Sequence, residues 1–365
     1  MRNAFVIMAG LLIAAEVTAQ TAPVRKPVAT PRPGPSVVPA STARRDSSSP
    51  AFSESLVNAR PRRFPVRIPK SGAVALQVQI LLDRANFSPG IIDGAWGNNA
   101  ARALAFFTGN ESGDRTLAST ARATTLDQAT YDKLRENAGS VPLLVRHRLS
   151  ASDLRGPYLD IPKNVYLQAK LRCLCYSSAV EALAERFHTS PKLLAQLNPK
   201  VRLEKLAAGA TILIPNVDNE RDASRADTMI VARLVVSRSG FWTQAQDPAG
   251  HIIYHFPSTL GGGFDPSPLG EFKVNHVAWS PSFRYQPKLF SEVPDSEPEA
   301  LLPPGPNSPV GEVWISLSKP HYGIHGTSSP ETIGYATSHG CVRLTNWDAR
   351  QLGLLVESGI PVVFR

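Results

Sequence analysis

The sequence predicts a multidomain protein that ends in an all-β domain with one short helix, preceded by a small helical domain and a small α+β domain. Three observations lead to this prediction. The composition changes near residues 20 and 70, apolar residues then recur at helical spacing, and after residue 228 they alternate in short runs that pause at glycine. A chain of 365 residues also exceeds the size of one typical core.

The first residues have the pattern of a secretory signal peptide. Arg2 precedes an apolar run from Ala4 to Ala15, and Val17 and Ala19 place small residues before a cleavage site. The run is shorter than the about 20 residues that a membrane-spanning helix needs. We therefore expect a signal peptide at residues 1–19 and export to an oxidising compartment. A retained membrane anchor is the alternative.

The segment at residues 20–70 is rich in Pro, Ser, Ala, Arg and Val. It can bury too little apolar surface to offset its ordering entropy, so we expect a disordered linker. Residues 1–70 carry eleven Lys/Arg and three Asp/Glu, nearly all of the net charge of +9. The remainder is almost neutral, which argues against a nucleic-acid partner. We expect the basic linker either to contact an anionic membrane or wall polymer, or only to aid solubility.

A small helical domain is expected at residues 71–140. Apolar residues recur at helical spacing from Val74 to Ala85, and a second helix opens near Asn98 after a loop with two glycine turns. Thr125 and Gln128 form a predicted capping box for a further helix.

The loop between the first two helices has the pattern "pG-x-iDG-x-wG", which resembles the peptidoglycan-binding domain 1 family. The resemblance rests on Gly90, Asp93, Gly94 and Gly97. It implies a role in binding the cell wall. The alternative is a helical packing domain without a ligand.

A small α+β domain is expected at residues 160–218, with a strand, two short helices and a closing strand. Ser178 with Glu181 forms a capping box, and Ser190-Pro191 opens the next helix. The stretches "LNP" and "GATILIP" resemble the lysin motif (LysM) family. This resemblance implies binding of glycans that contain N-acetylglucosamine.

Cys173 and Cys175 are separated by one residue. A disulfide between them needs a tight turn that brings their Cα atoms within about 7 Å. Three interpretations remain: a redox-sensitive bridge, an intermolecular link, or two small buried side chains. We expect the third, because free cysteine is among the most buried residue types.

An all-β domain is expected at residues 228–365. The runs "MIVARLVVSRSGFWTQAQ", "GHIIYHFPSTLGG" and "GEFKVNHVAW" alternate and pause at glycine, as short antiparallel strands do. One helix is expected near residues 346–357. This part of the sequence has neither a βαβ rhythm nor a glycine-rich phosphate loop.

Cys341 lies in the stretch "SHGCVRL". A thiol attacks an acyl group as the thiolate, so it needs a nearby base and backbone N–H groups that hold the oxyanion. His339 and His325 are the candidate bases, and Gly340 lets the backbone approach a substrate carbonyl. Because the number of cysteines is odd, pairing of the other two leaves Cys341 a free thiol.

The stretches "IHGT" and "GYATSHGCVRL" resemble the active-site signature of the L,D-transpeptidase (YkuD-type) family. Two upstream stretches also match: "GPNSPVGEVWISL", and "FPSTLGGGFDPSPLGEF" with Ser267 where threonine is commoner. The match covers nearly the whole third domain. It implies a YkuD-like β-sandwich with a short helix.

The resemblance also implies roles for individual residues. Cys341 corresponds to the nucleophile and His325 to the proton acceptor and donor. The residues that shape the loop and the oxyanion hole correspond to Ser338, His339 and Gly340. The substrate-binding residues correspond to Arg343, Gly326, Thr327 and Tyr322. Arg343 is expected either to steer a stem-peptide carboxylate or to form a structural salt bridge.

Geometry favours His325 over His339 as the base. Residues two apart in a strand are separated by about 6.6 Å, whereas a base must lie within about 3.2 Å of the thiol or contact it through one water. A histidine on a neighbouring strand meets this requirement more easily. We expect His325 on the strand beside the cysteine loop, and His339 to shape that loop.

As the resemblance implies, the enzyme is an acyltransferase without a metal or other cofactor, located in the periplasm and associated with the cell wall. Its partners are peptidoglycan stem peptides and glycan strands. It forms a thioester with a tetrapeptide stem, releases D-alanine and makes a 3→3 crosslink. The alternatives are an L,D-carboxypeptidase, or transfer of the acyl group to a protein or a D-amino acid.

Two further interpretations belong to other classes of protein. His325, His339 and Cys341 could be three zinc ligands of a catalytic metal site, although their spacing is not that of a helical or knuckle site. The chain could also be a non-enzymatic scaffold that binds peptidoglycan through its first two domains.

Overall fold

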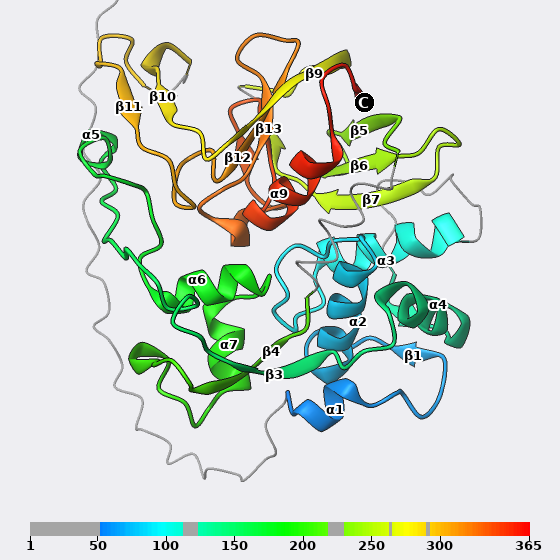
Figure 1. The fold of residues 1–365 in the computed structure, drawn as a ribbon. Coiled ribbons are helices and arrows are strands. Elements are labelled where there is room, and N and C mark those ends of the chain that lie inside the picture. Colours follow the sequence, from blue (N-terminus) through cyan, green and yellow to red (C-terminus); the bar gives the residue numbers. More distant parts are fainter. Residues whose placement is uncertain (1–51, 112–122, 218–229, 263–264, 290–292) are drawn as a thin grey trace, which may run out of the picture. The chain divides into compact units, whose positions relative to one another are not determined.

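The computed structural model describes residues 52–111, 123–217, 230–262, 265–289 and 293–365 (Figure 1). The expected signal peptide and most of the expected linker lie outside these ranges. All described residues belong to one compact unit. Within them, no helix combines the length and the apolar run required to cross a bilayer.

The expected linker is too long at its C-terminal end. Residues 54–58 form helix α1 (Glu54–Asn58), and β1 (Val66–Arg67) pairs with β2 (Thr125–Leu126). Val57 and Ile68 are buried. Residues 52–70 are therefore part of the folded unit, because their few apolar side chains find partners in segments that follow much later in the chain.

Three helices follow in the expected order: α2 (Ala73–Arg84), α3 (Asn98–Glu111) and α4 (Gln128–Ala138). The predicted capping box at α4 is wrong. Asp127 is the N-cap, and its carboxylate accepts a hydrogen bond from the N–H of Thr130. Thr125 lies in β2 instead, where pairing with β1 fixes its backbone.

The α+β segment contains, in chain order, β3 (Leu144–Arg148), α5 (Val165–Gln168), α6 (Ala179–Arg186), α7 (Pro191–Leu197), the 3₁₀ helix η1 (Leu203–Lys205) and β4 (Thr211–Pro215). Ser178 caps α6 and Ser190 caps α7, as predicted, but the carboxylate of Glu181 accepts from the N–H of Ser177 rather than from that of Ser178. The position of the opening strand is wrong: β3 begins at Leu144, before the expected boundary at residue 160, and it pairs antiparallel with β4.

Cys173 and Cys175 are joined by a disulfide, with their Cα atoms 5.2 Å apart. The expectation of two separate buried side chains is therefore wrong. Leu174 is the buried residue of this turn. Its N–H donates to the carbonyl of Pro304, and its carbonyl accepts from the N–H of Asn307, so these bonds hold the disulfide segment against residues 304–307.

The C-terminal segment is built from strands and one α-helix. The elements are β5 (Arg233–Ser237), β6 (Trp242–Gln246), β7 (Ile252–Pro257), β8 (Leu260–Gly261), β9 (Gly270–Trp279), β10 (Phe283–Tyr285), η2 (Pro287–Leu289), β11 (Ala300–Leu302), β12 (Val313–Leu317), β13 (Gly323–His325), η3 (Pro330–Thr332), β14 (Thr337–Ser338), β15 (Val342–Arg343), α9 (Asn346–Leu355) and β16 (Pro361–Phe364).

Eight of these strands form one curled sheet in the order β15-β13-β12-β9-β16-β5-β6-β7. The long strand β9 joins its halves, because residues 270–273 pair with β16 and residues 274–279 pair with β12 (Figure 1). Buried residues of both halves, such as Leu234 and Ile315, belong to one core with residues of α9. The expected sandwich is thus a single sheet that folds over a shared core.

The three expected domains do not have separate cores. Leu193 and Leu197 of α7, and Val235 and Trp242 of the sheet, belong to the same cluster as the buried face of α2. Polar contacts add to this packing: the hydroxyl of Ser88 donates to the carboxylate of Asp348, 3.0 Å away. The boundaries proposed from composition therefore separate segments that pack together as one unit.

Asp348 makes the stability of this unit depend on pH. Its side chain is buried, and burial, together with the nearby charge of Asp83, raises the pKa of this carboxyl from 3.8 to about 7. Between about pH 4 and about pH 7, the Asp348 carboxyl therefore keeps its proton in the folded state and has lost it in the unfolded state. The contribution of Asp348 to stability is therefore complete below about pH 4 and declines as the pH rises through about 7.

Replacing Asp348 with Asn should remove this decline, because the amide keeps the size of the carboxylic acid and does not ionise. Urea unfolding between about pH 4 and about pH 7 measures the effect. We expect the stability of Asp348→Asn, relative to the unaltered chain, to improve steadily across this interval. If the difference between the two proteins does not change with pH, Asp348 titrates normally and the interpretation fails.

Candidate active site

Cys341 lies in a short link between two strands that each pair in parallel with a neighbour. Before it, β14 pairs with β8, and after it, β15 pairs with β13. Cys341 is only partly buried. Its sulfur lies 3.5 Å from the carbonyl oxygen of His321, which the thiol donates to. The link is therefore held at both ends while the sulfur remains accessible.

His325 lies on β13, the strand that adjoins the cysteine loop. The register pairs Ile324 with Val342 and His325 with Arg343, so Cys341 falls beside Gly323, whose N–H contacts the sulfur. The register thus brings β13, which carries His325, alongside the segment that contains Cys341.

The imidazole of His325 is held in one tautomer. Its Nδ1 lies 2.7 Å from the carbonyl oxygen of Gly326, and because a carbonyl only accepts hydrogen bonds, Nδ1 carries the hydrogen. Nε2 then has the free lone pair. The ring of Trp314 stacks on the imidazole, with 5.3 Å between ring centroids. The carbonyl and the indole together orient the ring.

Burial keeps the imidazole of His325 neutral. Burial, and to a lesser extent the positive charge of Arg343, lower the pKa of the imidazole to about 3, against the opposing effect of the Gly326 carbonyl. Burial also raises the pKa of the Cys341 thiol, which the Gly323 N–H and Arg343 only partly offset. The resting pair is therefore thiol and imidazole rather than thiolate and imidazolium.

Backbone geometry of the loop requires glycine at position 340. Gly340 has φ of +98°, and a Cβ there would lie 2.9 Å from Cε1 of Tyr322. The Ser338 hydroxyl donates to the carbonyl of Cys341 across 2.5 Å. These contacts fix the peptide planes on both sides of the cysteine.

Ser267 is a further site residue, whose role is not evident from the sequence. It is buried, its hydroxyl donates to the carbonyl of Gly340 across 2.7 Å, and it accepts from the N–H of Gly261 across 2.9 Å. The sequence feature that could have indicated a role for Ser267 is its position in the stretch "FPSTLGGGFDPSPLGEF", which resembles the family pattern. The hydroxyl ties β8 to the cysteine loop.

Arg343 has no acidic partner among the described residues, and its buried Nε makes no hydrogen bond there. Its backbone is fixed, because its N–H and carbonyl exchange hydrogen bonds of 2.9 Å with Thr259. Burial lowers the pKa of the guanidinium. The expected alternative, a structural salt bridge, is thus not formed in the part of the chain that the structure describes.

The other predicted residues surround this pair. Thr327 is buried and accepts from the N–H of Ser329, Gly326 packs against Asn346, and His339 is partly buried in the loop. The remaining histidines have other surroundings: for example, His255 lies among aromatic rings and His251 pairs with Asp247.

A metal centre was one alternative for the histidines and the cysteine. In the described ranges, the structure contains no group of three His, Cys, Asp or Glu side chains in an arrangement that could hold a metal ion. His325, His339 and Cys341 are therefore not gathered as ligands.

Comparison with known proteins identifies the family to which the chain belongs. The sequence profile of the L,D-transpeptidase catalytic domain (YkuD) matches residues 232–364. The putative L,D-transpeptidase YkuD of Bacillus licheniformis is 31% identical over 183 residues, which are 50% of this chain and 91% of that protein. Its counterpart in Bacillus subtilis strain 168 is 28% identical with the same coverage.

Solved structures are similar at a lower level. The crystal structure of L,D-transpeptidase 3 from Mycobacterium tuberculosis has 19% identity and a TM-score of 0.30, and covers 36% of this chain and 59% of that one. The family assignment depends on the sequence matches. This chain belongs to the YkuD family of L,D-transpeptidases, which are cysteine-dependent acyltransferases.

Proposed function

We propose that this protein is a periplasmic, wall-associated L,D-transpeptidase that forms 3→3 crosslinks between peptidoglycan stems. One observation carries the proposal: the neutral imidazole of His325, with its Nδ1 hydrogen held by Gly326, lies on β13, and β13 pairs with β15, the strand that directly follows the free thiol of Cys341. An acyl transfer that starts from a thiol needs such a base.

In the first half of the reaction, Nε2 of His325 takes the proton of the Cys341 thiol as the sulfur attacks the carbonyl carbon of the third stem residue. The bond from that carbon to the nitrogen of the terminal D-alanine then breaks. The imidazolium returns the proton to the departing amine, and a thioester remains on Cys341.

In the second half, the side-chain amine of another stem's third residue attacks the thioester. His325 accepts a proton from this amine and returns it to the sulfur, which restores the thiol. Attack by water gives an L,D-carboxypeptidase, and attack by a protein amine or a D-amino acid gives other products. These acceptors are the alternative outcomes of the product analysis below.

Arg343 is proposed to bind a carboxylate of the stem peptide. Its guanidinium is partly buried and has no acidic partner among the described residues, while its backbone is held by Thr259. A partly desolvated cation of this kind favours an incoming carboxylate, which it can bind through two parallel hydrogen bonds.

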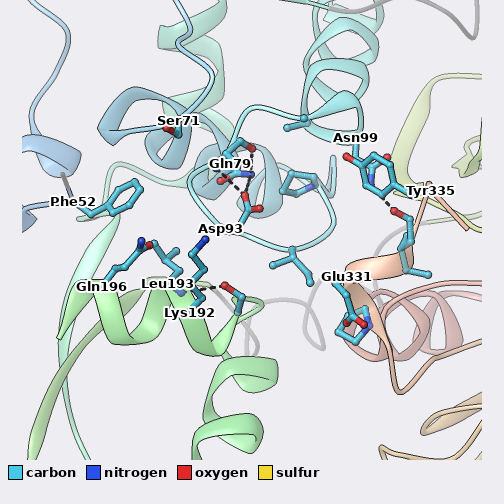
Figure 2. A pocket seen from close by; sticks show the side chains of 18 of the residues that line it. Phe52, Ser71, Gln79, Asp93, Asn99, Lys192, Leu193, Gln196, Glu331 and Tyr335 are labelled. Carbon is cyan, nitrogen blue, oxygen red and sulfur yellow. Dashed lines mark hydrogen bonds between the residues drawn. The ribbon is translucent and has the colours of Figure 1, made fainter. Parts of the chain in front are cut away.

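A cavity of about 650 Å³ is the proposed contact for glycan strands (Figure 2). It is lined by Phe52, by the first expected domain (Asp93, Asn99), by α7 (Lys192, Gln196) and by the segment between His325 and Cys341 (Glu331, Tyr335). Its lining combines apolar side chains with three amides, two carboxylates and one ammonium group. This mixture suits a neutral polar ligand that offers hydroxyl and acetamido groups.

The N-terminal residues are proposed to export the chain and to hold it near the wall. Their sequence supports this, since an apolar leader precedes a strongly basic stretch. The basic stretch is proposed to contact anionic membrane lipid or wall polymer through its positive charge.

Cys341→Ala should abolish acylation, because no other free thiol exists in the described chain. Incubation of the purified protein with disaccharide tetrapeptide, followed by mass spectrometry, measures both the thioester and the products. We expect crosslinked dimers and free D-alanine from the unaltered protein and neither from the variant. Carbapenems, which the family resemblance implies as acylating agents, should label only the unaltered protein. An undiminished adduct on Cys341→Ala would remove Cys341 from its role.

Separate replacement of His325 and His339 by glutamine tests which histidine is the base. His325→Gln should slow acylation by on the order of 10² to 10⁴, because the proton of the thiol loses its acceptor. His339→Gln should cost less and act mainly on substrate positioning. The rates of carbapenem adduct formation provide the comparison. The assignment is wrong if His339→Gln is the more damaging change.

Tyr335→Ala tests the glycan contact. Tyr335 is 60% exposed at the rim of the cavity, so its removal should leave the fold intact. In a Cys341→Ala background, we expect the affinity for peptide-free glycan strands to fall about fivefold or more. Trp279→Ala, an exposed aromatic residue outside the cavity, is the matched control. Equal affinities for both variants would argue against glycan binding in this cavity.

A further inference from the structure

We infer that Asn346, held by Glu185 from α6, is a positioning residue for His325. The inference rests on the proposed role of His325 as the base. It adds that a side chain outside the matched catalytic domain, residues 232–364, helps to set the geometry of that base. Three groups of contacts lead to it.

Every polar atom of the Asn346 side chain is used. Asn346 is the first residue of α9 and is 1% exposed. Its Nδ2 donates to Oε1 of Glu185 across 2.8 Å and to the carbonyl of Pro306 across 3.1 Å. Its Oδ1 accepts from the N–H of Glu312 across 3.2 Å. A buried amide with all of its partners has a single orientation.

This amide lies directly against the backbone that holds His325. A Cβ on Gly326 would lie 2.1 Å from Oδ1 of Asn346, and a Cβ on Gly311 would lie 2.0 Å from the same oxygen. The amide of Asn346 is thus packed closely against both Gly326 and Gly311, and it cannot move toward either of them. Because the carbonyl of Gly326 is the acceptor for Nδ1 of His325, a displaced Asn346 lets this peptide group and the imidazole move together.

Glu185 brings the α+β segment into contact with this site. Besides the amide of Asn346, its Oε1 accepts from the hydroxyl of Tyr176 across 3.2 Å. The same helix also contacts the segment before β12, where Asn307 donates to Glu181. Burial raises the pKa of Glu185 to about 8, so at neutral pH the group is mostly an uncharged acid. Such an acid still accepts from the amide without placing a full negative charge near His325.

The chain of contacts therefore runs from Glu185 through Asn346 and Gly326 to Nδ1 of His325. The effect is one of position, since neither Glu185 nor Asn346 exchanges a proton with the substrate. Loss of the acceptor at position 185 should lower the rate of the chemical step and leave substrate binding unchanged. Misplacement of a base by a fraction of its contact distance costs roughly tenfold to a hundredfold in rate.

The experiment is a double-mutant cycle in the full chain. The rate of Cys341 acylation by a carbapenem is measured for Glu185→Ala, for His325→Gln and for both together. We expect Glu185→Ala to lower the acylation rate roughly tenfold to a hundredfold, with the concentration for half-maximal rate unchanged. In the His325→Gln background, the same substitution should have almost no further effect, because its target is already absent.

Two variants and one spectroscopic measurement complete the test. Glu185→Gln keeps an acceptor for the amide and should restore most of the rate. Glu181→Ala removes a carboxylate on the same helix that contacts Asn307 and not Asn346, and should leave the rate unchanged. Nitrogen chemical shifts of the imidazole should show the Nδ1–H tautomer in the unaltered protein and a mixture of tautomers in Glu185→Ala.

The outcomes separate this inference from the proposed function. If the unaltered protein is not acylated at Cys341, the proposed function fails. If it is acylated but Glu185→Ala costs the same factor with and without His325, the residue acts on the fold in general and the positioning inference fails. An unchanged acylation rate in Glu185→Ala also overturns it.

Discussion

The parallel pairing of β13 with β15 is the interaction on which the candidate site depends. It matches Ile324 with Val342 and thereby sets His325 beside Arg343 and the end of the cysteine loop beside Gly323. A shift of this register by one residue would send His325 to the opposite face of the sheet. The core below the pair, with Ile324 and Val342 fully buried, resists such a shift because the pattern of buried side chains fits one register only.

Burial sets the electrostatic state of the same pair. The imidazole of His325 is buried and the thiol of Cys341 is partly buried, and this burial favours their neutral forms by lowering the pKa of the imidazole and raising the pKa of the thiol. In the proposed reaction, the ion pair forms only as the thiol reacts, and Arg343 then supplies a nearby positive charge. The contacts of Gly326 and Trp314 keep the ring ready for this step without a charged partner.

The segments before the catalytic sheet are joined to it by buried polar contacts as well as by apolar packing. Ser88 bonds to Asp348, and Glu185 bonds to Asn346, so two residues in the first turn of α9 receive partners from two different earlier segments. Buried polar contacts of this kind specify one mutual arrangement, because an unpaired partner would be costly. They also connect the surroundings of the proposed glycan contact to the helix that follows Cys341.

The sequence by itself determined what depends on neighbouring residues. The caps at Ser178 and Ser190, the helices that begin at Ala73 and Asn346, and the surroundings of Cys341 in "SHGCVRL" all follow from short patterns. Contacts between remote segments account for the rest: the opening strand β3, the structure of residues 52–70, and the hydrogen bonds of Ser267 and Glu185. These contacts join residues far apart in the chain, and no local pattern encodes which distant group will lie within hydrogen-bond reach after the core has formed.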